Sequence, residues 1–141
     1  MKDPQDRFEI IAHPQNAALA RERVRRAAKE NGFTPPEIDD IEVAVGEAAT
    51  NAILYGSPTA TSRIVVATWF SRADGAFHIE IRDQGQGFDP DHIRADADAD
   101  ALGGRGIRLM RALMDRILLY YDGHGMSVRL TKLLPAPPPA P

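Results

Sequence analysis

The chain contains no cysteine among its 141 residues, which excludes disulfide bonds, thiolate metal sites and cysteine nucleophiles. It has no apolar run close to the roughly 18 residues that a membrane-spanning helix requires. Its start, MKDPQDRFEI, has no apolar signal-peptide segment. With 17 basic and 20 acidic residues the net charge is only −3, so bulk charge gives no reason to expect nucleic-acid binding. We therefore expect a cytoplasmic protein that contacts neither a membrane nor nucleic acid directly.

The composition is that of one ordinary globular domain. Hydrophobic residues make up 43% of the chain and charged residues 26%, and 141 residues are enough to bury a single core. The end of the chain, PAPPPAP, has the composition of an exposed proline-rich segment. We predict one domain over residues 1–134, followed by a flexible tail over residues 135–141.

Apolar periodicity predicts a strand and two helices in the N-terminal part. Residues 7–14 have the apolar pattern of a short strand that ends at a proline, and residues 16–32 have that of an amphipathic helix. The second helix starts at residues 34–37, where a capping box is combined with proline at the first helical position. Its expected core seam consists of Ile38, Ile41, Val45, Ala48, Ala52 and Tyr55, and Gly56 is expected to end the helix.

The remaining elements predict an α+β protein. Residues 61–73 and 76–83 have the pattern of two strands joined by a turn, and residues 117–134 have that of a hairpin. A third helix is expected over residues 107–117. The stretch before it, residues 83–106, is rich in glycine and aspartate, contains the acidic repeat ADADADA and is predicted to be a functional lid. Helices clustered against a mostly antiparallel sheet predict a two-layer α/β sandwich.

The second predicted helix carries a polar pair, Glu47 and Asn51. Residues at i and i+4 lie on one face of a helix, so both side chains point the same way. An amide oxygen is a suitable ligand for Mg²⁺, and a carboxylate can deprotonate a hydroxyl or a water. By itself the ExxxN pattern is weak evidence for a functional site, because the edge of any helix could carry it.

The second motif, RDQGQGF, places Asp83 at the end of a predicted strand and follows it with Gly85 and Gly87. A carboxylate at that place can accept a hydrogen bond from the exocyclic amine of adenine, and glycines permit backbone shapes that other residues resist. Taken alone, an ordinary glycine-rich turn is the better interpretation.

The third motif, GGRGI, comes directly before the third predicted helix and contains Gly103, Gly104, Arg105 and Gly106. Glycines let backbone N–H groups approach phosphate, and a helix N-terminus favours negative charge. The chain has no GxxxxGK[ST] motif, so this is not a P-loop. Alone, the motif fits a flexible helix entry equally well.

Taken in this order, the three motifs resemble the N, G1 and G2 boxes of the Bergerat-fold (GHKL) ATPases. Within that superfamily, VGEAATNAILYG, IRDQGQGFDP and GGRGIRLMRALMD resemble the bacterial anti-sigma-factor serine/threonine kinases, from about Phe8 to Leu133. The resemblance implies a two-layer sandwich whose mixed, mostly antiparallel sheet is covered on one face by helices and carries an ATP lid. One departure is Tyr55, at a position where many relatives have histidine.

The resemblance also implies a role for each motif residue. Glu47 would be the general base, Asn51 would coordinate Mg²⁺ and Asp83 would recognise the adenine of ATP. The remaining expected ATP-binding residues shape the pocket or lie beside the phosphates: Gly85, Gly87, Gly103, Gly104, Arg105 and Gly106.

The implied function is that of an anti-sigma factor, which sequesters a sigma factor and phosphorylates a serine or threonine of a STAS-type anti-anti-sigma partner. Homodimerisation is suggested by the resemblance alone. One alternative is a partner-switching module that binds ATP without kinase activity. A weaker alternative is the catalytic domain of a histidine kinase, because the chain has no long dimerising helix with a phospho-acceptor histidine.

Overall fold

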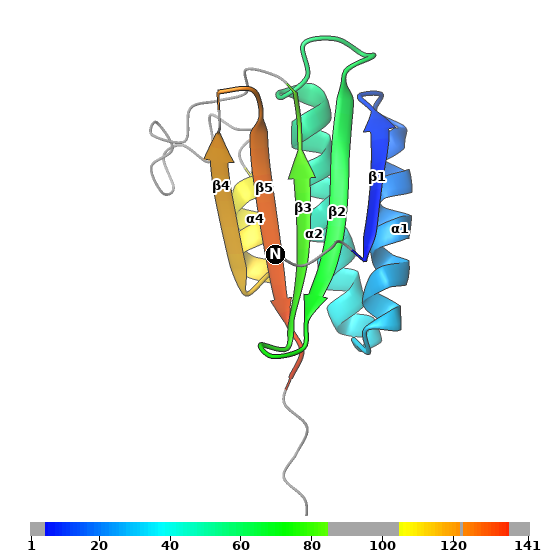
Figure 1. Cartoon of the computed structure of the whole chain (residues 1–141), viewed down its shortest axis with the longest axis vertical. Helices are drawn as coiled ribbons and strands as arrows, with labels where there is room; N and C mark the ends of the chain where they lie inside the picture. The colour runs from blue at the N-terminus through cyan, green and yellow to red at the C-terminus, as the bar shows by residue number, and fades with distance from the viewer. Residues whose placement is uncertain (1–4, 85–104, 122, 136–141) are drawn as a thin grey trace, which may run out of the picture.

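The computed structural model describes residues 5–84, 105–121 and 123–135 of the chain. Residues 85–104 of the predicted lid, which include Gly85, Gly87, Gly103 and Gly104, lie outside these residues, as does all of the predicted tail except Pro135. The described residues form two layers, a five-stranded sheet and a layer of helices (Figure 1). The two-layer α/β sandwich is therefore confirmed.

The sheet has the strand order β1-β2-β3-β5-β4. A mixed, mostly antiparallel sheet was expected, and the four pairings in the described part are all antiparallel. The strands are β1 (Asp6–Ile11), β2 (Arg63–Ser71), β3 (Ala76–Arg82), β4 (Arg116–Tyr121) and β5 (Met126–Leu133). The turn expected between β2 and β3 is present, and Gly75 in it has a φ of +62°, which a side chain would disfavour.

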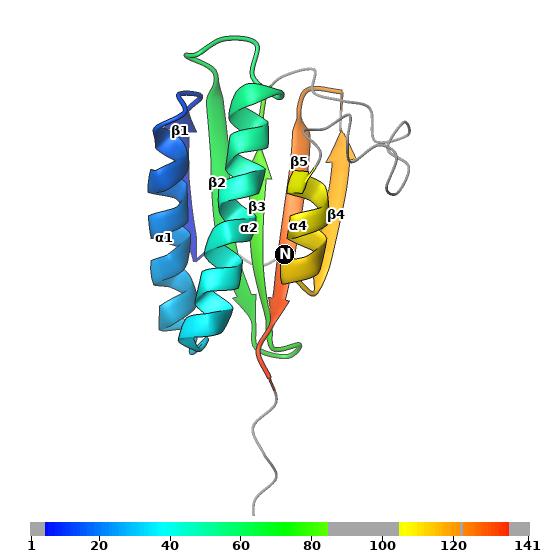
Figure 2. The ribbon, with the colours of Figure 1, turned by 180° about the vertical axis from the view of Figure 1, so that it is seen from behind.

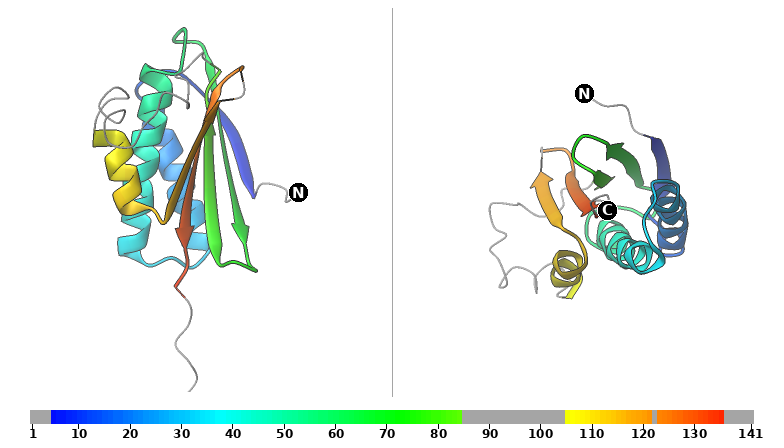
Figure 3. Two further views of the ribbon diagram at one scale, coloured as in Figure 1. Left: turned by 90° about the vertical axis from the view of Figure 1, so that its left-hand side faces the viewer. Right: turned by 90° about the horizontal axis from the view of Figure 1, so that it is seen from below.

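The described helices are α1 (Asn16–Glu30), α2 (Pro35–Leu54) and α4 (Arg105–Leu113). All three cover the same face of the sheet, as the views from behind and from the side show (Figures 2 and 3). In the part of the chain that the structure describes, none of these helices is long and apolar enough to cross a membrane.

Local sequence signals explain where α1 and α2 meet. Gly32, directly after α1, has a φ of +91° and lets the chain turn away from the helix. The backbone N–H of Thr34 donates a hydrogen bond to the Glu37 carboxylate at 2.8 Å, as the capping box predicts. Farther from this junction, Arg25 of α1 pairs with Glu42 of α2 at 2.8 Å, which links the exposed surfaces of the two helices.

The core lies between the helices and one face of the sheet. Phe77, Ile79 and Ile81 of β3 point into it at 0–1% exposure, so the predicted alternation of this strand is confirmed. The helices contribute small and branched side chains, among them Val24, Ile41, Val45, Ala48, Ile107 and Met110. Because α2 presents several alanines to the sheet, it can pack closely against it.

The opposite face of the sheet carries a half-buried polar network. Arg129 donates to the Glu80 carboxylate at 2.9 Å and lies over the Trp69 ring, and the Tyr120 hydroxyl donates to the same carboxylate at 2.9 Å. Burial and the hydrogen bond to Glu80 raise the pKa of Tyr120. Trp69 in turn stacks on His78 with ring centroids 5.1 Å apart. Hydrogen bonds and ring contacts therefore order this face, since the three described helices all lie on the other face of the sheet (Figures 2 and 3).

Two details of the sequence prediction are wrong. Tyr55 was placed in the core seam of α2, but it is 52% exposed, because it is the C-cap where the backbone leaves the helix and the helical period no longer directs its side chain. The third helix was expected to reach Ile117, but α4 ends at Leu113 and β4 begins at Arg116. The Asp115 backbone N–H donates to Thr131 O at 2.9 Å and the Asp115 carboxylate accepts from Leu133 N–H at 2.7 Å, so pairing with β5 replaces the last helical turn.

We predict that Ile79→Ala lowers the free energy of unfolding by about 2–5 kcal/mol, because it leaves a cavity beneath the helices. Leu19→Ala is the matched control, since Leu19 on α1 is 47% exposed, whereas Ile79 is fully buried. Urea unfolding followed by circular dichroism measures both. Equal losses for the two variants would contradict the location of the core.

Candidate functional site

The polar pair of α2 lies between α2 and α4. Glu47 and Asn51 are both half-buried, whereas the neighbouring Ala48 and Ala52 point into the core. A Cβ atom placed on Gly106 would lie 3.3 Å from Oε2 of Glu47 and 3.2 Å from Nδ2 of Asn51. The structure therefore brings the first and third motifs into contact, and a side chain at position 106 would crowd both polar groups.

Helix α4 is held at this place by its own apolar face. Ile107 and Met110 are buried at 1% and 0% exposure, and Met114, directly after the helix, at 6%, so the helix cannot move away from α2 without exposing them. Its first turn contains Gly106 and therefore lies beside the polar pair. A helix N-terminus carries a partial positive charge and attracts anions such as phosphate.

Arg105 is the first residue of α4. Its backbone therefore lies beside Gly106 and close to the polar pair.

Asp83 follows directly after β3 and is 4% exposed. Its Oδ1 accepts a hydrogen bond from the backbone N–H of Met126 at 3.0 Å, and its own N–H donates to the Met126 carbonyl at 2.9 Å. The other carboxylate oxygen, Oδ2, lies against Gly56 at the end of α2. A buried carboxylate destabilises the folded state unless it is hydrogen-bonded, and the Met126 N–H supplies such a hydrogen bond here.

The C-terminal end of α2 joins these two parts of the site. Gly56 donates its N–H to the Asn51 carbonyl at 3.2 Å and also forms the wall against which the Asp83 side chain rests. Glu47, Asn51, Asp83 and Gly106 thus gather around one end of the sandwich, contributed by α2, β3 and α4. Three motifs that are separate in the sequence meet in the fold.

The donor set fits a Mg²⁺ ion that is bound largely through a phosphate ligand. In the described ranges no group of three or more histidine, aspartate or glutamate side chains could hold a metal by itself. Asn51 offers a neutral amide oxygen, and its Oδ1 lies 3.7 Å from where a Cβ of residue 106 would stand, so glycine there keeps a side chain from crowding this oxygen. Mg²⁺ in nucleotide sites typically has few protein ligands and keeps the rest of its shell for phosphate and water.

Sequence reasoning missed Gly56, Gly125 and Met126 as parts of this site. Gly56 was interpreted only as a helix end and Gly125 only as a turn residue. Their contacts with Asp83 join residues 27 and 42 positions apart, so no local pattern could have identified them.

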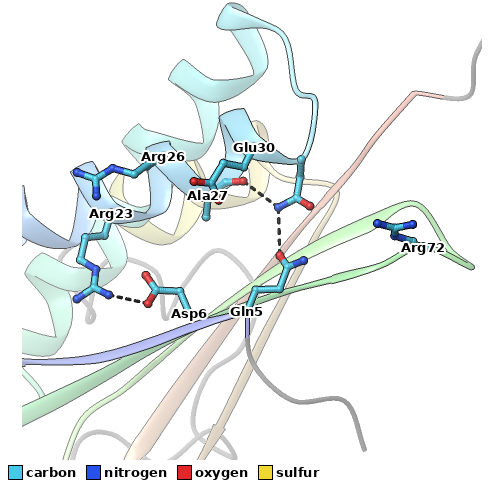
Figure 4. A pocket seen from close by; sticks show the side chains of 8 residues that line it. Gln5, Asp6, Arg23, Arg26, Ala27, Glu30 and Arg72 are labelled. Carbon is cyan, nitrogen blue, oxygen red and sulfur yellow. Dashed lines mark hydrogen bonds and ion pairs between the residues drawn. The ribbon is translucent and has the colours of Figure 1, made fainter.

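A separate open pocket of about 600 Å³ lies at the opposite end of the molecule, between the end of α1 and the start of β1. Within it Arg23 donates to Asp6 at 2.6 Å and Asn31 donates to Gln5 at 3.1 Å (Figure 4). Arg72 lies on the other side of the pocket, away from Arg23 and Arg26. The polar groups of the pocket therefore either pair with one another or lie apart. Among the described residues, none from the three motifs lines this pocket.

Comparison with known proteins agrees with this geometry. A family model described as a histidine kinase-like ATPase domain matches residues 10–132. The serine-protein kinase RsbW of Listeria monocytogenes serotype 4a (strain HCC23) is 29% identical over 136 residues, which cover 90% of this chain and 85% of the relative. The serine-protein kinase RsbW of Bacillus subtilis (strain 168) is 29% identical over 145 residues, which cover 95% and 89%.

Two solved structures share the fold. One contains the RsbU and RsbW domains of Rv1364c from Mycobacterium tuberculosis, with a TM-score of 0.69 and 24% identity over 96% of this chain and 34% of that one. The other is the SiaB–SiaC complex from Pseudomonas aeruginosa, with a TM-score of 0.62 and 14% identity over 91% of this chain and 89% of that one.

Proposed function

Because the chain belongs to the histidine kinase-like ATPase domain family, we propose that it is an ATP-dependent serine/threonine protein kinase that acts as an anti-sigma factor. It sequesters a sigma factor and phosphorylates a STAS-type anti-anti-sigma partner. The similarity to the serine-protein kinases RsbW, which extends over nine-tenths of the chain, supports this class of activity.

One observation of the site carries the proposal. The Glu47 carboxylate and the Asn51 amide share the space over Gly106, at the N-terminal end of α4. A module that only binds nucleotide needs the amide and the helix end, but it does not need a carboxylate beside them. The carboxylate is the group that a transfer reaction to a hydroxyl requires.

The chemistry assigns each residue a role. Asp83 accepts a hydrogen bond from the 6-amino group of adenine, and the backbone of the Gly104–Gly106 segment and the N-terminus of α4 bind the phosphates together with Arg105. Asn51 holds Mg²⁺ through Oδ1, and Mg²⁺ when bound neutralises phosphate charge. Gly85, Gly87 and Gly103 shape the rest of the nucleotide pocket.

In the transfer step Glu47 accepts the proton of the partner's serine or threonine hydroxyl. The hydroxyl oxygen forms a bond to the γ-phosphorus, the bond from that phosphorus to the bridging oxygen breaks, and ADP leaves. Most of the acceleration comes from holding the two reactants in line and from stabilising charge. Glu47 therefore takes up the proton, whereas the neutral Asn51 amide would hold the Mg²⁺ that balances the phosphate charge.

The effect on the partner is electrostatic. A phosphate adds about −1.5 to −2 charges, enough to disrupt an interface that was matched without it, so the kinase is released to bind its sigma factor. Such a switch operates where sigma factors act, which places the protein in the cytoplasm. A homodimer is part of the same proposal, as is a single ATPase domain over residues 1–134 of each chain.

We predict that Glu47→Gln lowers phosphate transfer about a hundred-fold or more, because a positioned base contributes roughly 10²–10⁴ to the rate. Binding of Mg-ATP is expected to remain, since Asn51 and Asp83 are unchanged. Transfer of radiolabel from ATP to the co-purified partner measures the first quantity, and calorimetry measures the second.

Asn51→Ala is the matched variant on the same helix face. It should weaken Mg-dependent ATP binding first and lose transfer as a consequence. Transfer at the wild-type rate by Glu47→Gln would contradict the role of Glu47 as the base. A wild type that binds ATP but transfers to no recovered partner would favour a binding module without kinase activity.

We also predict that Asp83→Asn lowers ATP affinity about ten- to a hundred-fold, because a hydrogen bond to a charged group is worth roughly 1.5–3 kcal/mol. The amide can turn a donor toward the adenine amine, which the carboxylate cannot do. Calorimetric titration of both proteins with ATP and GTP checks this prediction. Unchanged ATP affinity would remove Asp83 from the base pocket.

A further inference from the structure

Two glycines enclose Asp83 more tightly than any side chain would permit. A Cβ atom placed on Gly56 would lie 1.9 Å from Oδ2 of Asp83 and 2.5 Å from its Cγ, where real Cβ atoms essentially never come closer than 3.0 Å. A Cβ atom placed on Gly125 would lie 2.0 Å from the backbone oxygen of Asp83. One glycine therefore contacts the carboxylate, and the other contacts the backbone that carries it.

Neither glycine is required by its own backbone conformation. Among the described glycines, those with positive φ are Gly32, Gly75 and Gly123, and each of these occupies a turn or a helix end. Gly56 and Gly125 have no such restriction, so another residue could adopt their backbone angles. What excludes a side chain at both positions is the space that Asp83 occupies.

The carboxylate cannot simply rotate away from Gly56. Its Oδ1 accepts from the Met126 N–H at 3.0 Å, and the backbone of Asp83 is tied to the Met126 carbonyl at 2.9 Å. Movement of the side chain would break the first hydrogen bond in a buried place, where a lost partner is costly. The end of α2, the end of β3 and the start of β5 thus fix one orientation of this carboxylate.

We propose that Gly56 and Gly125 are positioning residues that set the base specificity of the nucleotide site by holding the Asp83 carboxylate in place. This inference rests on the proposed contact between Asp83 and the 6-amino group of adenine. An alanine at position 56 displaces the acceptor from that amine. An alanine at position 125 displaces the backbone of Asp83 from β5 and moves the acceptor with it.

The two substitutions act on the base and leave the phosphate end of the site in place. Glu47, Asn51 and Gly106 lie on the α4 side of α2, whereas Gly56 contacts Asp83 on the β3 side. Binding energy that comes from the phosphates should therefore survive, and only the part that depends on the 6-amino group should be lost. A general loss of structure would instead weaken all nucleotides alike.

The experiment compares ATP with purine riboside triphosphate, which is ATP without the 6-amino group. Dissociation constants for both nucleotides are measured by calorimetry for the wild type, Gly56→Ala, Gly125→Ala and Asp83→Asn. We expect the wild type to prefer ATP about ten- to a hundred-fold. In both glycine variants this preference should fall to that of Asp83→Asn, with little change for the purine analogue.

Two controls separate positioning from stability. Ser57→Ala removes a 2.8 Å hydrogen bond to Ala52 O from the same helix end but leaves Gly56 in place, so it should retain the preference for ATP. In the double variant Gly56→Ala/Asp83→Asn, the alanine should cause no further loss of preference, because both changes act through one carboxylate. Circular dichroism establishes that each variant is folded, and Gly125→Ala decides the question if Gly56→Ala does not fold.

Folded glycine variants that keep the wild-type preference, or that lose affinity for both nucleotides equally, would overturn the positioning role alone. A wild type that binds both nucleotides equally would overturn the adenine contact of Asp83 and this inference with it. A wild type that binds neither would contradict the proposed function itself.

Discussion

The close approach of the C-terminal end of α2 to the end of β3 is the contact on which the site depends. Gly56 lies against the Asp83 side chain without room for a Cβ atom, and the Met126 N–H holds that side chain from the β5 side. This contact fixes how far α2 extends along the sheet. Asn51 and Glu47 lie about one and two turns earlier on the same helix, beside Gly106 of α4.

A second constraint sets the position of α4. The buried side chains of Ile107 and Met110, together with Met114 directly after the helix, hold it against the core, and Gly106 in its first turn lies beside Glu47 and Asn51. The polar pair therefore lies at the seam between two helices, half-buried rather than enclosed in the core. This explains how α2 can carry a carboxylate and an amide along with its alanines, since neither group has to lose all of its contact with solvent.

Both constraints depend on glycine, for a reason of space and not of flexibility. At position 106 a side chain would crowd the polar pair, and at positions 56 and 125 it would collide with Asp83. The glycines at positions 32, 75 and 123 serve the chain itself, because each has a positive φ. The fold thus uses one residue type for two purposes, and only the glycines at positions 56, 106 and 125 belong to the proposed nucleotide site.

The sequence by itself determined the layer of helices on an antiparallel sheet, because apolar periods of two and of about 3.6 residues set which face of each element is buried. It also determined the start of α2 at Thr34 and the polar pair at Glu47 and Asn51, since capping and i, i+4 spacing are local. Tertiary structure decided the rest. Tyr55 lies outside the core because α2 ends before it, and Met114–Ile117 lie outside α4 because the chain there pairs with β5. Gly56 contacts Asp83, which lies 27 residues later in the sequence. Such contacts depend on how whole helices and strands pack, and no local pattern of residues encodes which distant residues come together.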